Sequence, residues 1–365
     1  MSAALLSIIA ATENLAGWRR RAAAFIAGVL SALAQAPFYL LPLILAGFCI
    51  LILLIDGART SERPFRRGFS AGWFFGFGYF LVSLFWVGFA FLVQAEEFAW
   101  MAPFAVSGLP AFLALFTGLA TGLCARYGGA GWERIFSFAA LYMAAEYARG
   151  HILTGLPWNL PGQALAGTAI GAQTAAWWGA YGLSFIVLLI ATAPMALKDE
   201  GARGLRKGAL AALAAAAAIV AVGALRLALH PPADHPDTYV RIVQPNIPQR
   251  EKIDPDLWRR NYERQIALSA GAAPATGIGF ILWPENAVPV IDEVPEGLEA
   301  LSRRLPENAV LLAGAVRRET GDAGKTLYYN SISVIAGTAS GRAPVAHYDK
   351  HHLVPFGEYL PLFGL

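Results

Sequence analysis

Apolar residues form long runs through the first part of the chain. The runs cover residues 22–36, 38–55, 69–93, 102–123, 135–150, 165–196 and 208–229. A helix of about 20 apolar residues crosses the hydrocarbon core of a bilayer; the first run is short for this and the sixth is overlong. The pattern predicts a polytopic α-helical membrane domain over residues 1–230, with about seven spans.

The pattern changes after residue 239. Short runs rich in β-branched and aromatic residues at 239–244, 279–283, 309–316 and 328–336 are typical of strands. Apolar positions with helical spacing occur at 255–270, and residues 296–304 fit a short helix. Alternating strands and helices favour a sheet with helices packed on it, so we expect a separate α/β domain over residues 231–365.

Composition supports this division. Hydrophobic residues make up 56% of the 365 residues, and the mean hydropathy is +0.49, which is too apolar for an ordinary soluble protein of this length. Residues 1–236 contain 25 charged side chains, whereas the final 129 residues contain 28. The chain therefore changes its solvent near Pro231 and Pro232.

The charges also predict an orientation. Loops on one side of the seven runs would hold thirteen Lys or Arg residues, and loops on the other side hold only Arg149. By the positive-inside rule the N-terminus is cytoplasmic and residue 231 onward lies outside the membrane on the other side. Residues 19–36, which end in Ala34-Gln35-Ala36, also resemble a cleaved signal peptide, although Pro37 is a poor residue after a cleavage site.

Several side chains in the apolar runs are candidates for function. Glu146 and Arg149 are three residues apart and share a helical face, so they form either a structural ion pair or a substrate contact. Trp158, with Trp177 and Trp178, fits either an interfacial aromatic belt or an acyl-chain site. The two cysteines, Cys49 and Cys124, are expected to be buried structural thiols.

Two charged residues follow expected strands in the second domain. Glu285 comes after an apolar strand and Pro284, beside the indole of Trp283, which would desolvate the carboxylate and favour a general-base role; the alternative is a surface glutamate after a strand. Lys350 comes at another strand end, where it is either a solvated loop lysine or an ammonium group that stabilises an oxyanion. The adjacent His351 and His352 point to opposite faces of an extended chain, so we expect no metal site.

Four segments together resemble the apolipoprotein N-acyltransferase family, membrane-embedded members of the nitrilase superfamily. They are Leu156-Pro157-Trp158-Asn159, residues 243–249, Trp283-Pro284-Glu285 and residues 348–358. The resemblance covers almost the entire chain. It implies seven spans, then a periplasmic nitrilase-like domain with an αββα sandwich, then a closing eighth span, in the bacterial inner membrane.

The resemblance also implies a reaction. A cysteine thiolate takes an acyl chain from a phospholipid as a thioester and yields it to the α-amino group of the N-terminal diacylglyceryl-cysteine of an apolipoprotein. Glu285 would be the general base, Lys350 the oxyanion-stabilising residue and Glu358 a second glutamate supporting the site; Trp158, Glu146 and Arg149 are the candidate substrate-binding residues. The expected partners are the phospholipid donor, the apolipoprotein acceptor and membrane lipids, with no nucleic acid and no cofactor.

The sequence departs from the family pattern at the nucleophile. The family's cysteine follows a few dozen residues after the Gly-Glu motif, and this sequence ends seven residues after Glu358. We therefore expect a truncated, inactive piece of a longer enzyme, with an incomplete nitrilase-like domain. The alternatives are a membrane-tethered nitrilase-type amidase, a non-catalytic membrane scaffold, and a transporter with an appended binding domain, although no internal repeat supports the last.

Overall fold

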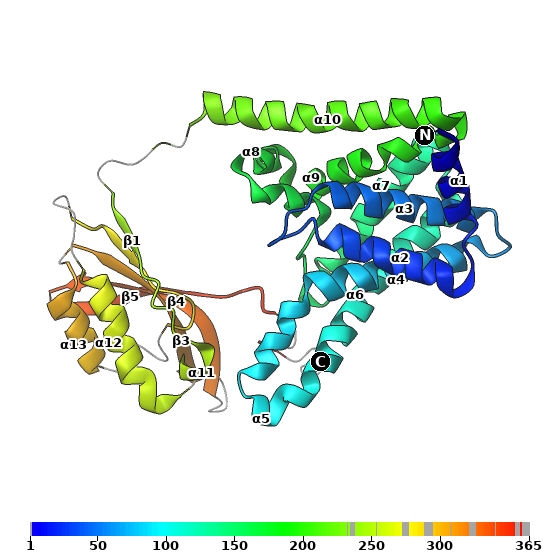
Figure 1. Cartoon of the computed structure of the whole chain (residues 1–365). Helices are drawn as coiled ribbons and strands as arrows, with labels where there is room; N and C mark the ends of the chain where they lie inside the picture. Colours follow the sequence, from blue (N-terminus) through cyan, green and yellow to red (C-terminus); the bar gives the residue numbers. More distant parts are fainter. Residues whose placement is uncertain are drawn as a thin grey trace. The chain divides into compact units, whose positions relative to one another are not determined.

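A computed structural model gives the fold of the chain, which forms two compact units (Figure 1). The structure describes residues 2–231, 233, 238–252, 254–271, 277–287, 295–306, 308–320, 326–339, 341–354, 358 and 359. The first unit, called the helical unit, contains residues 2–231 together with Val354, Glu358 and Tyr359. The second, called the sheet unit, contains the described residues from 233 to 353.

The helical unit consists of α-helices joined by short loops and 3₁₀ turns. Its elements are α1 (Ser2–Glu13), α2 (Gly17–Ala32), α3 (Pro42–Arg59), α4 (Pro64–Ser83), η1 (Phe85–Leu92), α5 (Ala95–Phe98), α6 (Ala102–Tyr127), α7 (Gly131–Arg149), α8 (Ala169–Ala172), α9 (Ala175–Thr192) and α10 (Gly201–Leu229). Each predicted apolar run overlaps one of α2, α3, α4, α6, α7, α9 and α10, and the runs at 69–93 and 165–196 also include η1 and α8, respectively. Helix α1 was not predicted, because its twelve residues are too few to cross a bilayer.

The described helices include membrane-spanning candidates. By length and composition, three helical stretches qualify, namely Pro42–Arg59, Ala95–Tyr127 and Ala175–Leu229. A fourth qualifies if Pro64–Ser83 and Phe85–Leu92, which are bent by 49°, form one span. The chain therefore contains several helices that could span a membrane. The count of seven spans stays a prediction, since α2 begins with three arginines and α7 carries charges at both ends.

The helices pack closely through aromatic and small residues. Phe48 of α3 lies 5.1 Å from the ring of Phe75 in α4 and 5.6 Å from that of Tyr142 in α7, measured between centroids. Gly28 of α2 lies against the backbone of α4: a β-carbon there would stand 1.9 Å from the carbonyl oxygen of Phe75. Small residues at such contacts let helix backbones approach, as is usual between helices in membranes.

The predicted run at 69–93 is not one straight helix. Helix α4 ends at Ser83, and the chain bends into η1. The bend is stabilised from a distant loop, because the Asn159 side chain donates a hydrogen bond to the carbonyl oxygen of Ser83 at 3.1 Å. This contact satisfies a carbonyl that the ended helix leaves without a partner.

The sheet unit contains one mixed five-stranded sheet. Its strands are β1 (Val240–Ile242), β2 (Phe280–Leu282), β3 (Val310–Thr320), β4 (Thr326–Thr338) and β5 (Gly341–Asp349), in the order β1-β2-β3-β4-β5. The first three are parallel, whereas β3, β4 and β5 are antiparallel. The helices are α11 (Gln249–Lys252), α12 (Trp258–Ser269) and α13 (Pro295–Arg304). The predicted strands and helices are thus present, although β1 and β2 have only three residues each.

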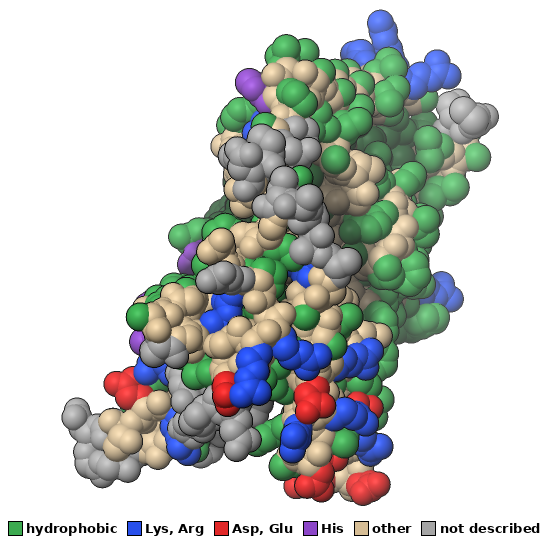
Figure 2. Space-filling model, turned by 90° about the vertical axis from the view of Figure 1, so that its left-hand side faces the viewer, with side chains coloured by type: hydrophobic (Ala, Val, Ile, Leu, Met, Phe, Trp, Pro, Cys, Tyr) green, Lys and Arg blue, Asp and Glu red, His purple; other side chains and the backbone are tan. Residues whose placement is uncertain are grey.

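The two faces of this sheet differ. Ile266 of α12 and Leu301 of α13 pack with Ile281 and Leu311 in a core under one face (Figure 1). Apolar side chains on the other face are exposed, including Ile242, Phe280, Ile332 and Tyr348. The αββα sandwich stays a prediction, and this exposed face is where a second sheet would pack. The outer sides of α12 and α13 carry ion pairs of Arg with Glu, and charges of both signs are interspersed in Figure 2.

Candidate active site

The segment that carries Glu285 is fixed against the neighbouring strand. Trp283 donates its backbone N–H to the carbonyl oxygen of Leu312 at 2.9 Å, and Ala287 donates to that of Gly314 at 2.8 Å. A β-carbon on Gly314 would stand 2.6 Å from the α-carbon of Glu285, so only glycine permits this approach. The backbone of Glu285 is therefore held between two contacts to β3.

The indole of Trp283 does not shield the carboxylate as expected. It is almost fully buried, and its Nε1 donates to Oγ of Ser269 at 2.8 Å. Tyr262 packs edge-on against it, and burial raises the pKa of the Tyr262 phenol. The Glu285 side chain, in contrast, is 64% exposed. The expected desolvation of the Glu285 carboxylate is therefore wrong. The Trp283 indole packs into the core between the sheet and the helices, whereas the chain leaves the sheet at Pro284 and the Glu285 side chain is in solvent.

Lys350 follows β5, which is three strands from β2 in the sheet order, and its side chain reaches Glu285. Its backbone N–H donates to the carbonyl oxygen of Asn330 at 2.9 Å, directly after β5 ends. The Lys350 Nζ lies 3.7 Å from Oε1 of Glu285. The prediction that the two residues approach one edge of the sheet is confirmed, and the pair is a partly exposed ion pair.

Asn330 is a third member of this group. Its Nδ2 donates to Oε1 of Glu285 at 2.5 Å, so the carboxylate is held by an amide and an ammonium group together. Asn330 and Lys350 extend from the same face as Ile332 and Tyr348, because successive side chains in a strand alternate between faces. The alternation of side chains along the strand could be read from the sequence. The pairing of strands that brings Asn330 to Glu285 could not.

The strand end before Lys350 is anchored by charge. Arg317 Nη2 lies 2.6 Å from Oδ2 of Asp349, its Nε donates to Oδ1 at 3.0 Å, and the Ser331 hydroxyl also donates to this carboxylate. The Arg317 guanidinium lies over the ring of Tyr329, 4.3 Å from its centroid. These hydrogen bonds lower the pKa of Asp349 from its usual 3.8 to about 2. The anchor fixes the backbone from which Lys350 extends.

Glu358 belongs to the helical unit. Its Oε2 accepts a hydrogen bond from the backbone N–H of Val354 at 2.8 Å. The adjacent Tyr359 hydroxyl lies 2.9 Å from Oγ1 of Thr154 and donates to the carbonyl oxygen of Leu153 at 3.0 Å. The other motif residues at 355–357, and the apolar end at 360–365, lie outside the described residues.

Glu146 and Arg149 are brought together as a buried ion pair. Each is 2% exposed, and Arg149 Nε donates to Oε2 of Glu146 at 3.2 Å. Arg149 also donates to the carbonyl oxygens of Leu156 and Trp158. The predicted pairing is confirmed. The pair therefore fixes the backbone of the loop after α7. The indole of Trp158 is on this loop and is not buried with the pair.

The indole of Trp158 is half-exposed. Its ring stacks on that of Trp86 in η1, with centroids 4.7 Å apart. Tyr79 donates to the carbonyl oxygen of Asn159 at 2.8 Å, which tightens the same loop. An exposed pair of stacked indoles on a fixed loop can contact an acyl chain.

A second apolar site lies between α9 and α10. It is a pocket of about 300 Å³, and its lining includes the exposed indoles of Trp177 and Trp178 with Ile219 and Val222. The two cysteines lie elsewhere in the helical unit: Cys124 is fully buried in α6, and Cys49 of α3 points its Sγ at the carbonyl oxygen of Ala191. Among the described residues, no three His, Cys, Asp or Glu side chains form a metal-binding group.

Comparison with known proteins gives similarity over nearly the whole chain. A family model described as the apolipoprotein N-acyltransferase N-terminal domain matches residues 27–193. The apolipoprotein N-acyltransferase of Rhodopseudomonas palustris is 39% identical over 376 residues, which cover 99% of this chain and 69% of the relative. Those of Brucella melitensis and Caulobacter vibrioides are both 42% identical, over 95% and 94% of this chain but 66% and 65% of the relatives. The chain spans about two thirds of the length of these proteins.

Proposed function

Because the chain belongs to the apolipoprotein N-acyltransferase family, we propose that the full-length protein transfers an acyl chain from a phospholipid to an apolipoprotein. The acceptor is the α-amino group of the N-terminal diacylglyceryl-cysteine. The observation that supports this proposal is the meeting of Glu285 with Lys350, whose Nζ lies 3.7 Å from the carboxylate. The proposal concerns the whole protein, since this chain covers about two thirds of its relatives.

The first step forms a thioester. Glu285 takes the proton of a cysteine thiol, and the thiolate attacks the ester carbonyl carbon of the phospholipid. The ammonium group of Lys350 stabilises the oxyanion of the tetrahedral intermediate. The carbon–oxygen bond then breaks, and the lysophospholipid alkoxide leaves with the proton from Glu285. The resemblance places the cysteine after the Gly357-Glu358 motif; Cys49 and Cys124, in α3 and α6, are not candidates.

The second step consumes the thioester. Glu285, ionised again, takes a proton from the acceptor amine as its nitrogen attacks the thioester carbonyl carbon. Lys350 again stabilises the oxyanion, the carbon–sulfur bond breaks, and the free thiol is restored with an amide as product. Splitting the transfer through a covalent intermediate suits two substrates that bind in turn. Asn330 holds the Glu285 carboxylate toward Lys350 throughout.

Other residues have supporting roles in this proposal. Glu358 is the second glutamate of the site. Trp158 contacts the acyl chain, whereas Glu146 and Arg149 act by holding its loop, because both are buried. The exposed apolar face of the sheet supports an αββα nitrilase-like arrangement, since a large apolar surface needs a cover.

The proposal includes the bacterial inner membrane as the site of action, with the sheet unit in the periplasm. It rests on the thirteen-to-one ratio of Lys and Arg between the two sets of loops. An alkaline phosphatase fused after Gly271 is expected to be active, because that enzyme needs an oxidising compartment. A reporter that works only in the cytoplasm can be fused at the same residue. If that reporter is active and alkaline phosphatase is not, the proposed orientation is wrong.

The decisive test replaces the proposed base. Glu285→Gln in the full-length protein keeps the shape and the contact to Asn330 but removes basicity, so thioester formation with a phospholipid is expected to fall about 10²–10⁴-fold. Trapping of the labelled acyl-enzyme measures it. The matched control is Glu299→Gln, an exposed glutamate of α13 whose carboxylate forms a surface ion pair with Arg303. Normal acyl-enzyme formation by Glu285→Gln would remove this residue from the base role.

A further inference from the structure

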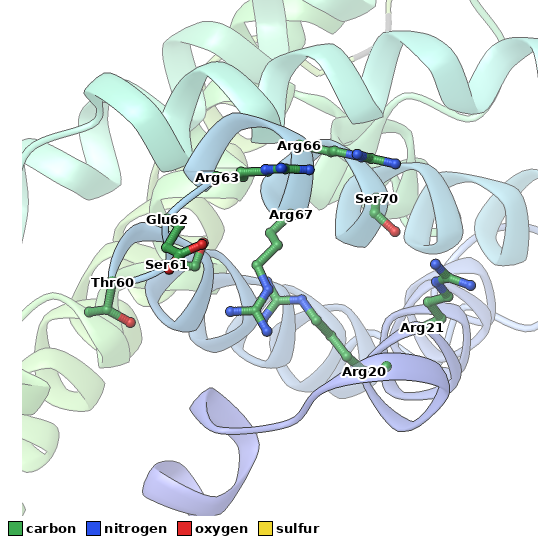
Figure 3. Close-up of a pocket in the computed structure, with 10 residues that line it drawn as sticks. Arg20, Arg21, Thr60, Ser61, Glu62, Arg63, Arg66, Arg67 and Ser70 are labelled. Atoms are coloured by element: carbon green, nitrogen blue, oxygen red, sulfur yellow. The ribbon is translucent and has the colours of Figure 1, made fainter.

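A basic pocket lies at one end of the helical unit, and none of the residues proposed for acyl transfer lines it. It has a volume of about 630 Å³ and forms where α2 begins, α3 ends and α4 begins (Figure 3). Five arginines line it together with a single carboxylate, Glu62; the arginines are Arg20, Arg21, Arg63, Arg66 and Arg67. The pocket therefore carries four more positive than negative charges.

Arg20 is the buried member of this group. It is 5% exposed, and its Nη2 donates to the carbonyl oxygen of Leu54. Its Nε and Nη1 are buried without a hydrogen-bond partner. A guanidinium group removed from water and left with unused donors is costly unless a ligand satisfies it.

The side chain of Arg67 adds a second cation at the same place. It extends from α4 into the pocket that Arg20 also lines, and the ends of the two side chains overlap in the view of Figure 3. Among the described residues, none of the five arginines forms an ion pair, and the Arg21 guanidinium lies 5.7 Å from the ring centroid of Phe74. The buried guanidinium group of Arg20 is repelled by the like charge of the more exposed Arg67, so an anion between these groups would stabilise both.

The helix termini strengthen the preference for an anion. Helices α2 and α4 both begin at the pocket, and neither has a side-chain cap at its N-terminus. Free backbone N–H groups and the positive end of the helix dipole therefore lie near the arginines. Trp18 and Phe65, beside the lining residues Gly17 and Arg66, are exposed aromatic side chains of the type that lie at a membrane surface.

We propose that this pocket binds a phosphate group, carried by the head group of an anionic phospholipid in the leaflet on that side of the membrane. Guanidinium groups bind phosphate oxygens through paired hydrogen bonds, and basic pockets between membrane helices suit anionic head groups. The ligand is not the acyl donor of the proposed reaction. Its phosphate joins α2 to α4 by neutralising Arg20 and Arg67, and so stabilises the helical unit.

The test measures thermal stabilisation of the intact chain in an uncharged detergent. Short-chain phosphatidylglycerol and sodium phosphate are titrated separately, with the same lipid tails on phosphatidylcholine as reference. The pocket variant is Arg63→Gln with Arg67→Gln, both exposed, and the control is Arg203→Gln with Arg206→Gln, two exposed arginines of α10 outside the pocket. Loss of two phosphate contacts is expected to weaken binding about 30-fold, against a small change in the control.

A third variant separates a binding pocket from general surface charge. Arg67→Glu places a carboxylate beside Arg20, so the lipid-free chain is expected to melt at a higher temperature while its response to phosphatidylglycerol is lost. A response to the lipid alone identifies the head group as the source, and an equal response to sodium phosphate identifies free phosphate. The proposal fails if neither probe binds, if the control loses as much affinity as the pocket variant, or if Arg67→Glu retains the response.

Discussion

Charged side chains lie in different surroundings in the two units. In the helical unit, Arg134 of α7 lies 2.7 Å from Oδ2 of Asp56, and Arg149 is paired with Glu146; all four residues are at most 9% exposed. In the sheet unit, Lys350 and Glu285 are 3.7 Å apart and their side chains are 34% and 64% exposed. Buried pairs hold the fold because an unpaired partner has no water, whereas exposed pairs contribute little to stability and are free to change protonation.

The strongest challenge to this comparison is removal of a buried partner. Arg149→Met leaves the Glu146 carboxylate buried without its cation and frees the carbonyl oxygens of Leu156 and Trp158. The helical unit is expected to lose about 3–5 kcal/mol of unfolding free energy. Denaturant unfolding in detergent measures this, with Arg203→Met in exposed α10 as the control. A loss as small as that of the control would mean that burial does not make the pair structural.

The opposite result is expected in the sheet unit. Lys350→Met keeps much of the aliphatic stem but removes the charge, so acyl transfer by the full-length protein is expected to fall about 10²–10³-fold. Its unfolding free energy is expected to change by less than about 1 kcal/mol, as for exposed ion pairs. His351→Ala serves as the control, since its ring lies against Tyr348 rather than at Glu285. Equal small effects of both substitutions would remove Lys350 from the oxyanion role.

Acid provides a smaller test of the sheet unit. Because the folded pKa of Asp349 is about 2 and the usual value is 3.8, the folded state favours the ionised form. This stabilisation is fully present above pH 4 and is lost as the pH falls toward 2. With a side chain 27% exposed, it is expected to be about 1 kcal/mol after screening by solvent.

Asp349→Asn should remove this pH dependence, and Asp256→Asn, at an exposed position, should keep it. Hydrogen exchange of the backbone amides of β3, β4 and β5 at several pH values measures this, because it reports the opening of the sheet unit alone. Identical pH profiles for the two variants would show that Arg317 does not bind the ionised carboxylate of Asp349.

Local pattern was sufficient for most elements and for part of the site. The apolar runs locate the long helices, and strand ends locate Glu285 and Lys350, because the carboxyl ends of strands gather at sheet edges. Asn330 was not predicted, although it lies in a predicted strand. Its contact to Glu285 depends on the pairing of β4 with β3 and β5, which joins residues 45 positions apart.

Other features could not be predicted from the sequence for similar reasons. Arginines before an apolar run mark a loop on the basic side, but that Arg20 and Arg67 enter one pocket follows from the packing of α2 on α4. The bend at Leu84 depends on Asn159, which is far along the chain. The Asn159 side chain donates a hydrogen bond to the carbonyl oxygen of Ser83. The solvation of Glu285 was predicted wrongly, because proximity in sequence to Trp283 does not fix which way each side chain points.

Gly314 connects the sheet to the reactive carboxylate in a way that makes the site sensitive to a single carbon atom. A methyl group there would overlap the carbonyl oxygen of Pro284, at 2.3 Å, and the α-carbon of Glu285. Relief of this overlap requires the Pro284–Glu285 segment to move outward from β3, which lengthens the distance from Glu285 to both Asn330 and Lys350. The width of one backbone gap therefore sets the distance between the proposed base, Glu285, and the proposed oxyanion-stabilising residue, Lys350. Substitution of residue 314 offers a means of adjusting that distance without altering either side chain.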